Sequence, residues 1–122
     1  MLYVGGYFTN ISGININYIC EWNGSNYKQL KCGLNAPPTK IISNLEGIIF
    51  VGGTFISAGG CSLNYITKWQ NNKWLPIDRG VNSNVLSLEC DNLGHIYIGG
   101  NFYKKLKNGE NMRVRISKWI WN

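Results

Sequence analysis

The sequence predicts an all-β protein built from three copies of one four-stranded unit. A motif of an aromatic residue, Val or Ile, and two glycines begins at Tyr3, Phe50 and Tyr97, 47 residues apart each time. Short apolar stretches alternate with turns rich in Gly and Asn. No segment keeps the 3.6-residue periodicity of an amphipathic helix for even three turns.

The repeat covers the whole chain and divides it into three copies, 1–47, 48–94 and 95–122. The first two copies align without a gap, so that Trp22 matches Trp69. The third copy is incomplete, and a three-residue insertion precedes Ile116, after which Trp119 takes the place of Trp69. A fixed period of this length is typical of repeat architectures, so we treat 1–122 as one segment.

Each copy predicts four strands in the same order. The first strand is Lys40–Asn44 or Ser87–Asp91. The second is "IIFVGG" and its equivalents, whose successive apolar residues suit a strand covered on both faces. The third is "YICEW", "YITKW" or "RISKW", and the fourth, "YKQLKC" or "KWLPID", follows a polar turn. Glu21, Lys68 and Lys118 occupy one repeat position, which we expect on a solvated strand face.

Four strands repeated every 47 residues predict the blades of a β-propeller. A blade packed between two neighbours buries both of its faces, and aromatic residues of the outer hairpins fill the widening gap between blades. We expect this role for four tryptophans, Trp22, Trp69, Trp74 and Trp119.

The three blades are incomplete as a ring. The first copy supplies strands two to four, the second all four, and the third strands one to three. Propellers typically close with ~4–8 blades. We therefore expect the remaining blades to come from a longer chain or from related chains. A homodimer is not favoured, because an end blade without strand four would meet one without strand one.

The paired glycines allow two interpretations, a phosphate-binding loop or the end of a strand. No predicted helix follows Gly52-Gly53 to offer its N-terminus to a phosphate, and the chain contains no G-K-[ST] sequence. We expect these glycines to end the second strand, where the backbone takes unusual φ angles or packs tightly.

The repeat carries a family resemblance. The strand with its paired glycines, the "YIxxW" strand and a Trp or Tyr five residues later resemble the kelch, or galactose-oxidase, type of propeller repeat. The fuller pattern "FVGGTFxSAGGxxxNYIxxWxxxxW" is closer to the kelch-like repeats of fungal cortical-marker proteins and of some large DNA viruses. It departs from ordinary kelch units in the added "SAGG" and in lacking their Tyr-Asp pair. The resemblance implies the fold and no particular activity.

The residues predict no catalytic, cofactor-binding or metal site, and the chain is not expected to be an enzyme. His95 is the single histidine and has no Ser or Cys nucleophile near it in sequence, so we expect a partly buried structural residue. A copper site of the galactose-oxidase kind needs two histidines. No C-x-x-C pair occurs, and a turn centred on Gly24-Ser25 places Cys20 opposite Gln29 rather than Cys32, which favours free thiols.

Positive charge is the remaining functional feature. The net charge is +6, and half of the twelve basic residues fall within 104–118. Most of them lie in the loop between the second and third strands of the third copy, whose counterparts in the other copies are uncharged. The predicted partner-binding residues are Lys104, Lys105, Lys107, Arg113 and Arg115. A solvated loop and a contact with nucleic acid or another polyanion are the alternatives to a protein contact.

These observations favour a non-enzymatic β-propeller module that binds another protein or further blades. The alternatives are polyanion binding by the basic loop, and a propeller enzyme whose active site lies outside this segment. No apolar run approaches the ~20 residues that span a bilayer, and the N-terminus has no signal-peptide pattern. We expect an intracellular or virion-associated protein.

Overall fold

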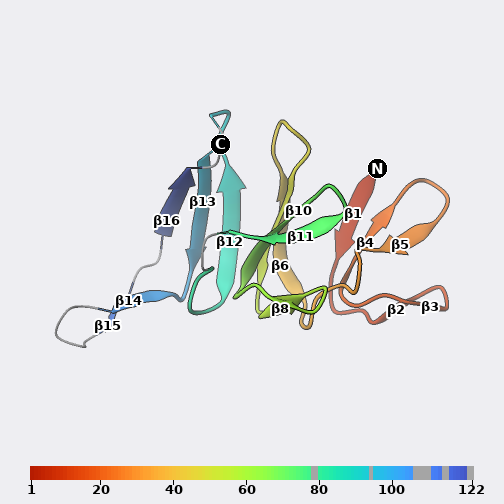
Figure 1. The fold of residues 1–122 in the computed structure, drawn as a ribbon, viewed down its shortest axis with the longest axis horizontal. Helices are drawn as coiled ribbons and strands as arrows, with labels where there is room; N and C mark the ends of the chain where they lie inside the picture. Colours follow the sequence, from red (N-terminus) through yellow and green to blue (C-terminus); the bar gives the residue numbers. More distant parts are fainter. Residues whose placement is uncertain (78–79, 94, 106–110, 114–115, 121–122) are drawn as a thin grey trace.

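A computed structural model describes residues 1–77, 80–93, 95–105, 111–113 and 116–120, and their side chains up to Phe102. Its strands form three antiparallel sheets that stand side by side (Figure 1). The first sheet consists of β1 (Leu2–Gly5), β4 (Ile19–Trp22) and β5 (Tyr27–Gln29). The second consists of β6 (Pro38–Ser43), β7 (Ile49–Gly53), β10 (Ile66–Gln70) and β11 (Lys73–Pro76). The third consists of β12 (Val85–Cys90), β13 (His95–Gly100) and β16 (Ile116–Ile120).

The all-β prediction is confirmed, and the sheets contain three, four and three strands, as the repeat alignment predicts. The strand registers repeat as well. Gly52 lies opposite Ile66 in the second sheet, and Gly99 lies opposite Ile116 in the third. This pairing agrees with the predicted three-residue insertion before Ile116.

The first strands begin two residues earlier than predicted. In β6 the register shifts between Pro38 and Lys40, and in β12 it shifts at the equivalent place, between Val85 and Ser87. The shift is typical of a β-bulge, which lets pairing continue past an extra residue. This irregularity was not predicted from the sequence.

The connection between the second and third strands of each copy contains a small hairpin that the sequence did not predict. These hairpins are β2 (Asn10–Ile11) with β3 (Ile14–Asn15), β8 (Ser57–Ala58) with β9 (Cys61–Ser62), and β14 (Tyr103–Lys105) with β15 (Asn111–Arg113). All three lie along the same edge of the molecule, at the bottom of Figure 1. The strands of the first two are only two residues long, too short for an alternating pattern to appear in the sequence.

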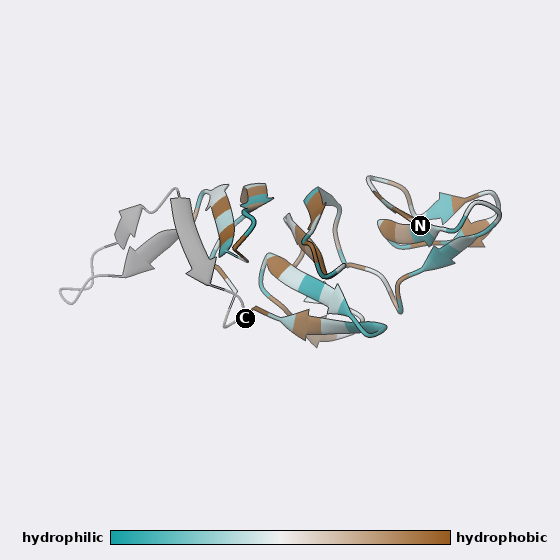
Figure 2. Ribbon diagram, turned by 90° about the horizontal axis from the view of Figure 1, so that it is seen from above, coloured by the Kyte–Doolittle hydropathy of each residue, from teal (hydrophilic) through white to brown (hydrophobic). Residues whose placement is uncertain are grey.

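Two apolar cores fill the spaces between the sheets. The first, between the first and second sheets, includes Ile19, Leu30, Val51, Trp69 and Trp74. The second, between the second and third sheets, consists mainly of aliphatic residues around one buried phenylalanine of β7: Ile48, Phe50, Ile66, Ile77, Val85, Leu88, Ile96, Ile98 and Phe102. Figure 2 shows the apolar bands along the strands from above.

The central sheet is therefore covered on both faces, and this corrects one expectation. Lys68 is only 6% exposed. It lies opposite Phe50 in the register, and Phe50 belongs to the second core. Burial lowers the pKa of Lys68. The equivalent Glu21, on the first sheet, is partly exposed, as expected.

The paired glycines serve tight packing rather than an unusual φ. Gly52 and Gly53 do not adopt positive φ angles. A Cβ atom on Gly52 would lie 2.5 Å from Cγ1 of Val85, and one on Gly53 would lie 2.8 Å from the carbonyl oxygen of Pro37. Gly52 thus allows β7 to approach β12 of the third sheet, and Gly53 allows it to approach the residue that precedes β6 in its own sheet.

The cysteines are not joined by disulfides in the structure. Cys20 lies opposite Gln29, as the predicted hairpin requires. No helix suited to crossing a membrane occurs within the described residues.

Candidate functional site

The predicted basic residues meet, as far as the structure describes them, on the third hairpin. Lys104 and Lys105 belong to β14, and Arg113 belongs to β15. Lys104 pairs with Met112 across the hairpin. Lys107 and Arg115 lie outside the described residues. The fold thus brings three of the five predicted residues to the third hairpin. This hairpin lies at one end of the row of three hairpins.

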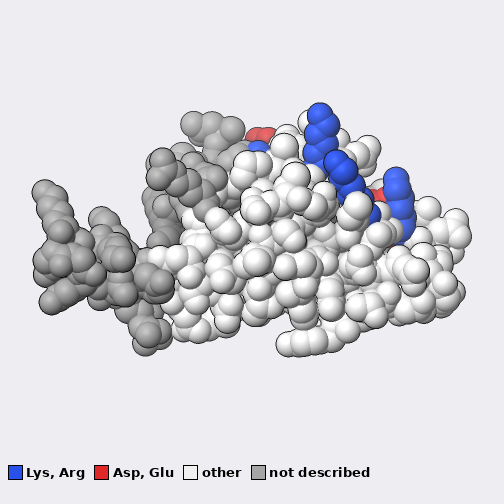
Figure 3. Space-filling model, turned by 60° about the horizontal axis from the view of Figure 1, so that its bottom comes forward, with Lys and Arg blue, Asp and Glu red and all other residues white. Residues whose placement is uncertain are grey.

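The edge that carries the hairpins is poor in charge elsewhere. Residues 5–19, 33–39, 52–67 and 80–88 contain no charged side chain. In Figure 3, which brings this edge forward, the coloured Lys, Arg, Asp and Glu atoms lie along the far rim. The described hairpin edge therefore offers neutral polar groups over its first two copies.

The outer face of the first sheet carries a row of apolar side chains. Leu2 lies opposite Trp22, and Trp22 lies opposite Tyr27, so the three lie on one face of the sheet. The rings of Trp22 and Tyr27 are 4.4 Å apart between centroids. Leu2 is 59% exposed, and both aromatic residues are partly exposed. We call these three residues the outer row.

The second sheet contains the equivalent row in a buried state. Ile49, Trp69 and Trp74 pair across β7, β10 and β11 in the same way. The rings of Trp69 and Trp74 are 4.9 Å apart, and their residues are 8% and 7% exposed. Nε1 of Trp74 donates a hydrogen bond of 3.0 Å to the carbonyl oxygen of Leu30, which directly follows β5 of the first sheet. The first sheet covers this row, as predicted for Trp69 and Trp74. Trp119 lies outside the described side chains.

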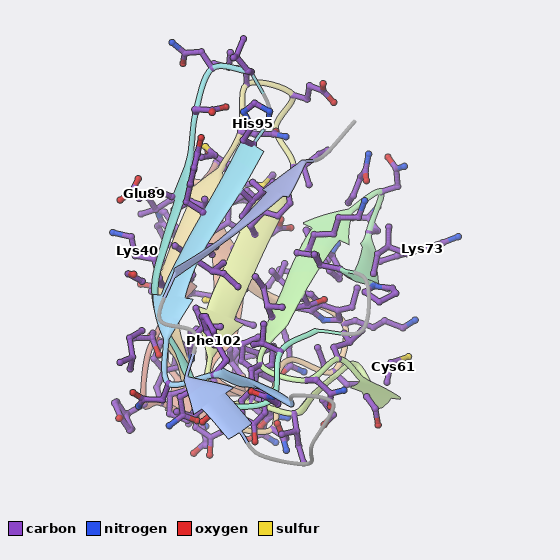
Figure 4. All side chains as sticks on the ribbon, turned by 90° about the vertical axis from the view of Figure 1, so that its left-hand side faces the viewer. Lys40, Cys61, Lys73, Glu89, His95 and Phe102 are labelled. Carbon is purple, nitrogen blue, oxygen red and sulfur yellow. The ribbon has the colours of Figure 1, made fainter. Side chains whose placement is uncertain are left out.

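A polar cluster on the third sheet was missed by sequence reasoning. Oδ2 of Asp91 lies 2.7 Å from Nδ1 of His95 and accepts a hydrogen bond of 3.1 Å from the hydroxyl of Tyr97. Oδ1 of Asp91 accepts hydrogen bonds from the backbone N–H groups of Leu93 and His95. His95 is labelled in Figure 4, at the end of β13 away from Phe102.

The repeat explains how this cluster forms. Asn44, the equivalent of Asp91, caps its own turn by accepting backbone hydrogen bonds from Glu46 and Ile48. The third copy keeps this cap, but it replaces Asn44 with a carboxylate and the apolar Ile48 and Phe50 with His95 and Tyr97. Strand residues two apart lie on one face, so the spacing of His95 and Tyr97 beside an acidic turn residue was the available indication.

The hydrogen bonds set the protonation of the cluster. Partial burial raises the pKa of Asp91, but the hydrogen bonds from His95, Leu93 and Tyr97 outweigh it and hold the pKa well below its ordinary value. The hydrogen bond to Asp91, together with partial burial and the negative charge of Asp91, raises the pKa of Tyr97. Asp91 is therefore a fixed carboxylate that orients the imidazole. The described contacts give His95 a carboxylate partner and no nucleophile.

We expect Asp91→Asn to weaken the acid dependence of stability. Asn keeps the backbone cap, as Asn44 does, but loses the carboxylate. Because the pKa of Asp91 is lowered in the folded state, its stabilisation is complete above the unfolded pKa of about 4 and is lost as the pH falls below it. The difference between the melting temperatures of the two proteins should therefore stay constant from pH 7 to about pH 5 and shrink as the pH falls from about 4 towards 2. A difference that stays constant below about pH 4 as well would contradict the assignment.

The described residues contain no group of three or more His, Cys, Asp and Glu side chains placed to hold a metal ion. Comparisons with models of protein families, with curated proteins and with solved structures find no match for this chain.

Proposed function

We propose that the chain is a segment of a kelch-like β-propeller and acts as a non-enzymatic structural or interaction module. Its first sheet docks against another sheet, supplied by a longer chain or by a partner protein. The observation that carries this proposal is the outer row, Leu2, Trp22 and Tyr27. The same row in the second sheet lies buried under a neighbouring sheet.

The way in which the sheets approach each other supports a radial arrangement. The main backbone contacts between sheets are made by β6 and β7 with β12, and by β1 with β6. These are the first or second strands of their copies. The large rings of Trp69 and Trp74 lie on the third and fourth strands, where the gap between the first two sheets needs more filling. Blades that diverge from a central axis have this geometry.

The oligomeric state tests the proposal. An exposed aromatic row and unpaired strand edges favour association. We expect light scattering to give a mass above the 13.8 kDa of one chain, or the isolated chain to aggregate. Trp22→Ala should reduce this association. Tyr7→Ala is the matched control, since Tyr7 is 91% exposed and lies outside the row. A well-folded, monodisperse monomer would refute the propeller assignment.

Polyanion binding by the third hairpin is the second candidate. The fold gathers Lys104, Lys105 and Arg113 on a hairpin whose two counterparts are uncharged. Changing Lys104, Lys105 and Lys107 to Gln should alter stability by less than ~0.5 kcal/mol. It should also weaken the binding of a polyanion such as single-stranded RNA and make that binding less dependent on the salt concentration. Equal binding of the polyanion by the wild type and the variant at low salt would show that the hairpin is only a solvated surface.

An active site completed by other blades is a less supported function, because the described residues supply only the Asp91–His95 pair. Free thiols suit a reducing compartment. We therefore propose an intracellular or virion-associated location.

A further inference from the structure

An open cleft of about 360 Å³ lies on the hairpin edge, where the first and second copies meet. Gly33, Leu34 and Asn35 form its floor. Leu34 N–H donates to the carbonyl oxygen of Asn17 at 3.0 Å, and Asn35 N–H donates to that of Ser57 at 3.2 Å. The floor is therefore bonded to both copies, and the cleft is a built feature of their junction. Its volume lies within the range of small-molecule sites.

Two asparagine side chains in the cleft have fixed orientations. Oδ1 of Asn35 accepts the backbone N–H groups of Ile56 at 2.9 Å and Ser57 at 3.1 Å, so the oxygen must face them. Its amide nitrogen is left as a donor. Nδ2 of Asn17 donates to the carbonyl oxygen of Cys32 at 3.3 Å, which leaves its Oδ1 as an acceptor. The cleft thus combines an oriented donor with an oriented acceptor.

The other lining residues include Tyr18, Cys32 and Leu34 besides small hydroxyl-bearing residues and glycines. Thr9 and Ser57 contribute hydroxyls, which either donate or accept. Gly59 and Gly60 form the glycine wall of the cleft. Nothing lies within 4 Å of a Cβ placed on Gly60, whereas one placed on Gly59 would lie 2.9 Å from Cδ1 of Trp74 and 3.5 Å from Cδ of Lys31. None of the lining residues is charged, so the lining itself supplies hydrogen-bonding groups rather than a countercharge.

The neutrality belongs to this junction and does not follow from the repeat. In the alignment, the next copy replaces Cys32 with Arg79, Ser57 with Lys104 and Gly60 with Lys107. An extended peptide also fits poorly against this wall. Strand β8 is bonded to β9 on one edge and to the floor on the other, through Leu34–Ala58 and Asn35–Ser57. No free strand edge of β8 remains for a peptide to join.

From these features we infer that the cleft binds a neutral, polyhydroxylated ligand of the carbohydrate class. A pair of sugar hydroxyls accepts from the amide of Asn35 and donates to Oδ1 of Asn17, and the glycine wall lets a ring approach closely. We expect a dissociation constant in the millimolar range, because the cleft is open to solvent. This binding does not depend on whether the sheets belong to a propeller.

Chemical-shift mapping by NMR tests the inference with maltose, cellobiose and N,N′-diacetylchitobiose at tens of millimolar. We expect at least one of them to shift the backbone amides of the cleft, including those of Asn17, Asn35 and Ser57. Asn35→Asp keeps the acceptor for Ile56 and Ser57 but replaces the donor with a charge, and binding should weaken about tenfold. Ser57→Ala, which leaves the backbone bonds intact, should weaken it less.

Asn44→Asp is the matched control. Asn44 accepts two backbone N–H groups in the same way, but it lies outside the cleft, and its variant should bind like the wild type. Three outcomes would overturn the inference: no shift with any of the three sugars, equal loss in the Asn35 and Asn44 variants, or tighter binding of a neutral extended peptide at the same amides.

Discussion

Trp69→Ala is expected to lower the free energy of unfolding by about 3–5 kcal/mol. Trp69 is 8% exposed and packs in the first core against Trp74. Its removal opens a cavity between the first and second sheets. Aggregation on expression is the expected consequence in so small a domain. Urea unfolding followed by circular dichroism measures the loss.

Trp22→Ala is the matched control for this prediction. Trp22 occupies the same position in the repeat, and its ring also packs against an aromatic ring five residues later, that of Tyr27. Unlike Trp69, it lies partly exposed in the outer row. Its loss should cost less than half as much as the loss of Trp69. A Trp69→Ala protein that stays as stable as the wild type but no longer binds a ligand would show that the aromatic pair is a binding site rather than packing.

Gly52→Val is expected to be the second most damaging change, at about 1–3 kcal/mol or more. The new Cβ would lie 2.5 Å from Cγ1 of Val85 and 3.0 Å from its Cβ, so either β7 or β12 must move. Both atoms belong to the buried side of the third sheet, where Val85 is fully buried. The melting temperature should fall by several degrees.

Two further variants separate packing from other roles of Gly52. Adding Val85→Ala to a Gly52→Ala protein should recover part of the loss, because the clash is with the Val85 side chain. Gly6→Val should cost less, because a Cβ there meets only the ring of Phe8, at 3.3 Å. Normal folding of Gly52→Val together with loss of nucleotide binding would revive the phosphate-loop interpretation.

The strand order and pairing were predictable because they depend on local sequence. The 47-residue period aligned Trp22 with Trp69, and the same cross-strand pairing follows in both sheets. The predicted turn at Gly24-Ser25 placed Cys20 opposite Gln29 without knowledge of the fold. Pairing between neighbouring strands is fixed by hairpin length, so a repeat in sequence becomes a repeat in register.

The candidate sites were less predictable, since they form between segments distant in sequence or on strands too short to show a pattern. The basic residues were identified by charge alone, whereas the hairpin that holds Lys104 and Arg113 was not foreseen. The cleft lies between Asn17 of the first copy and Ser57 of the second. Their carbonyl oxygens accept hydrogen bonds from the N–H groups of Leu34 and Asn35. Such contacts depend on how adjacent copies pack, and no spacing within one copy encodes them.

Periodicity and turn chemistry were enough to predict the all-β class, the three-, four- and three-stranded sheets and the aromatic positions of the packing. They do not predict which of the equivalent positions are buried. The tertiary structure buries Lys68 but leaves Glu21 partly exposed, and it covers Trp69 but leaves Trp22 in an open row. The physical reason is that burial depends on whether a neighbouring sheet covers a face. Equivalent residues in a repeat therefore share a register without sharing an environment.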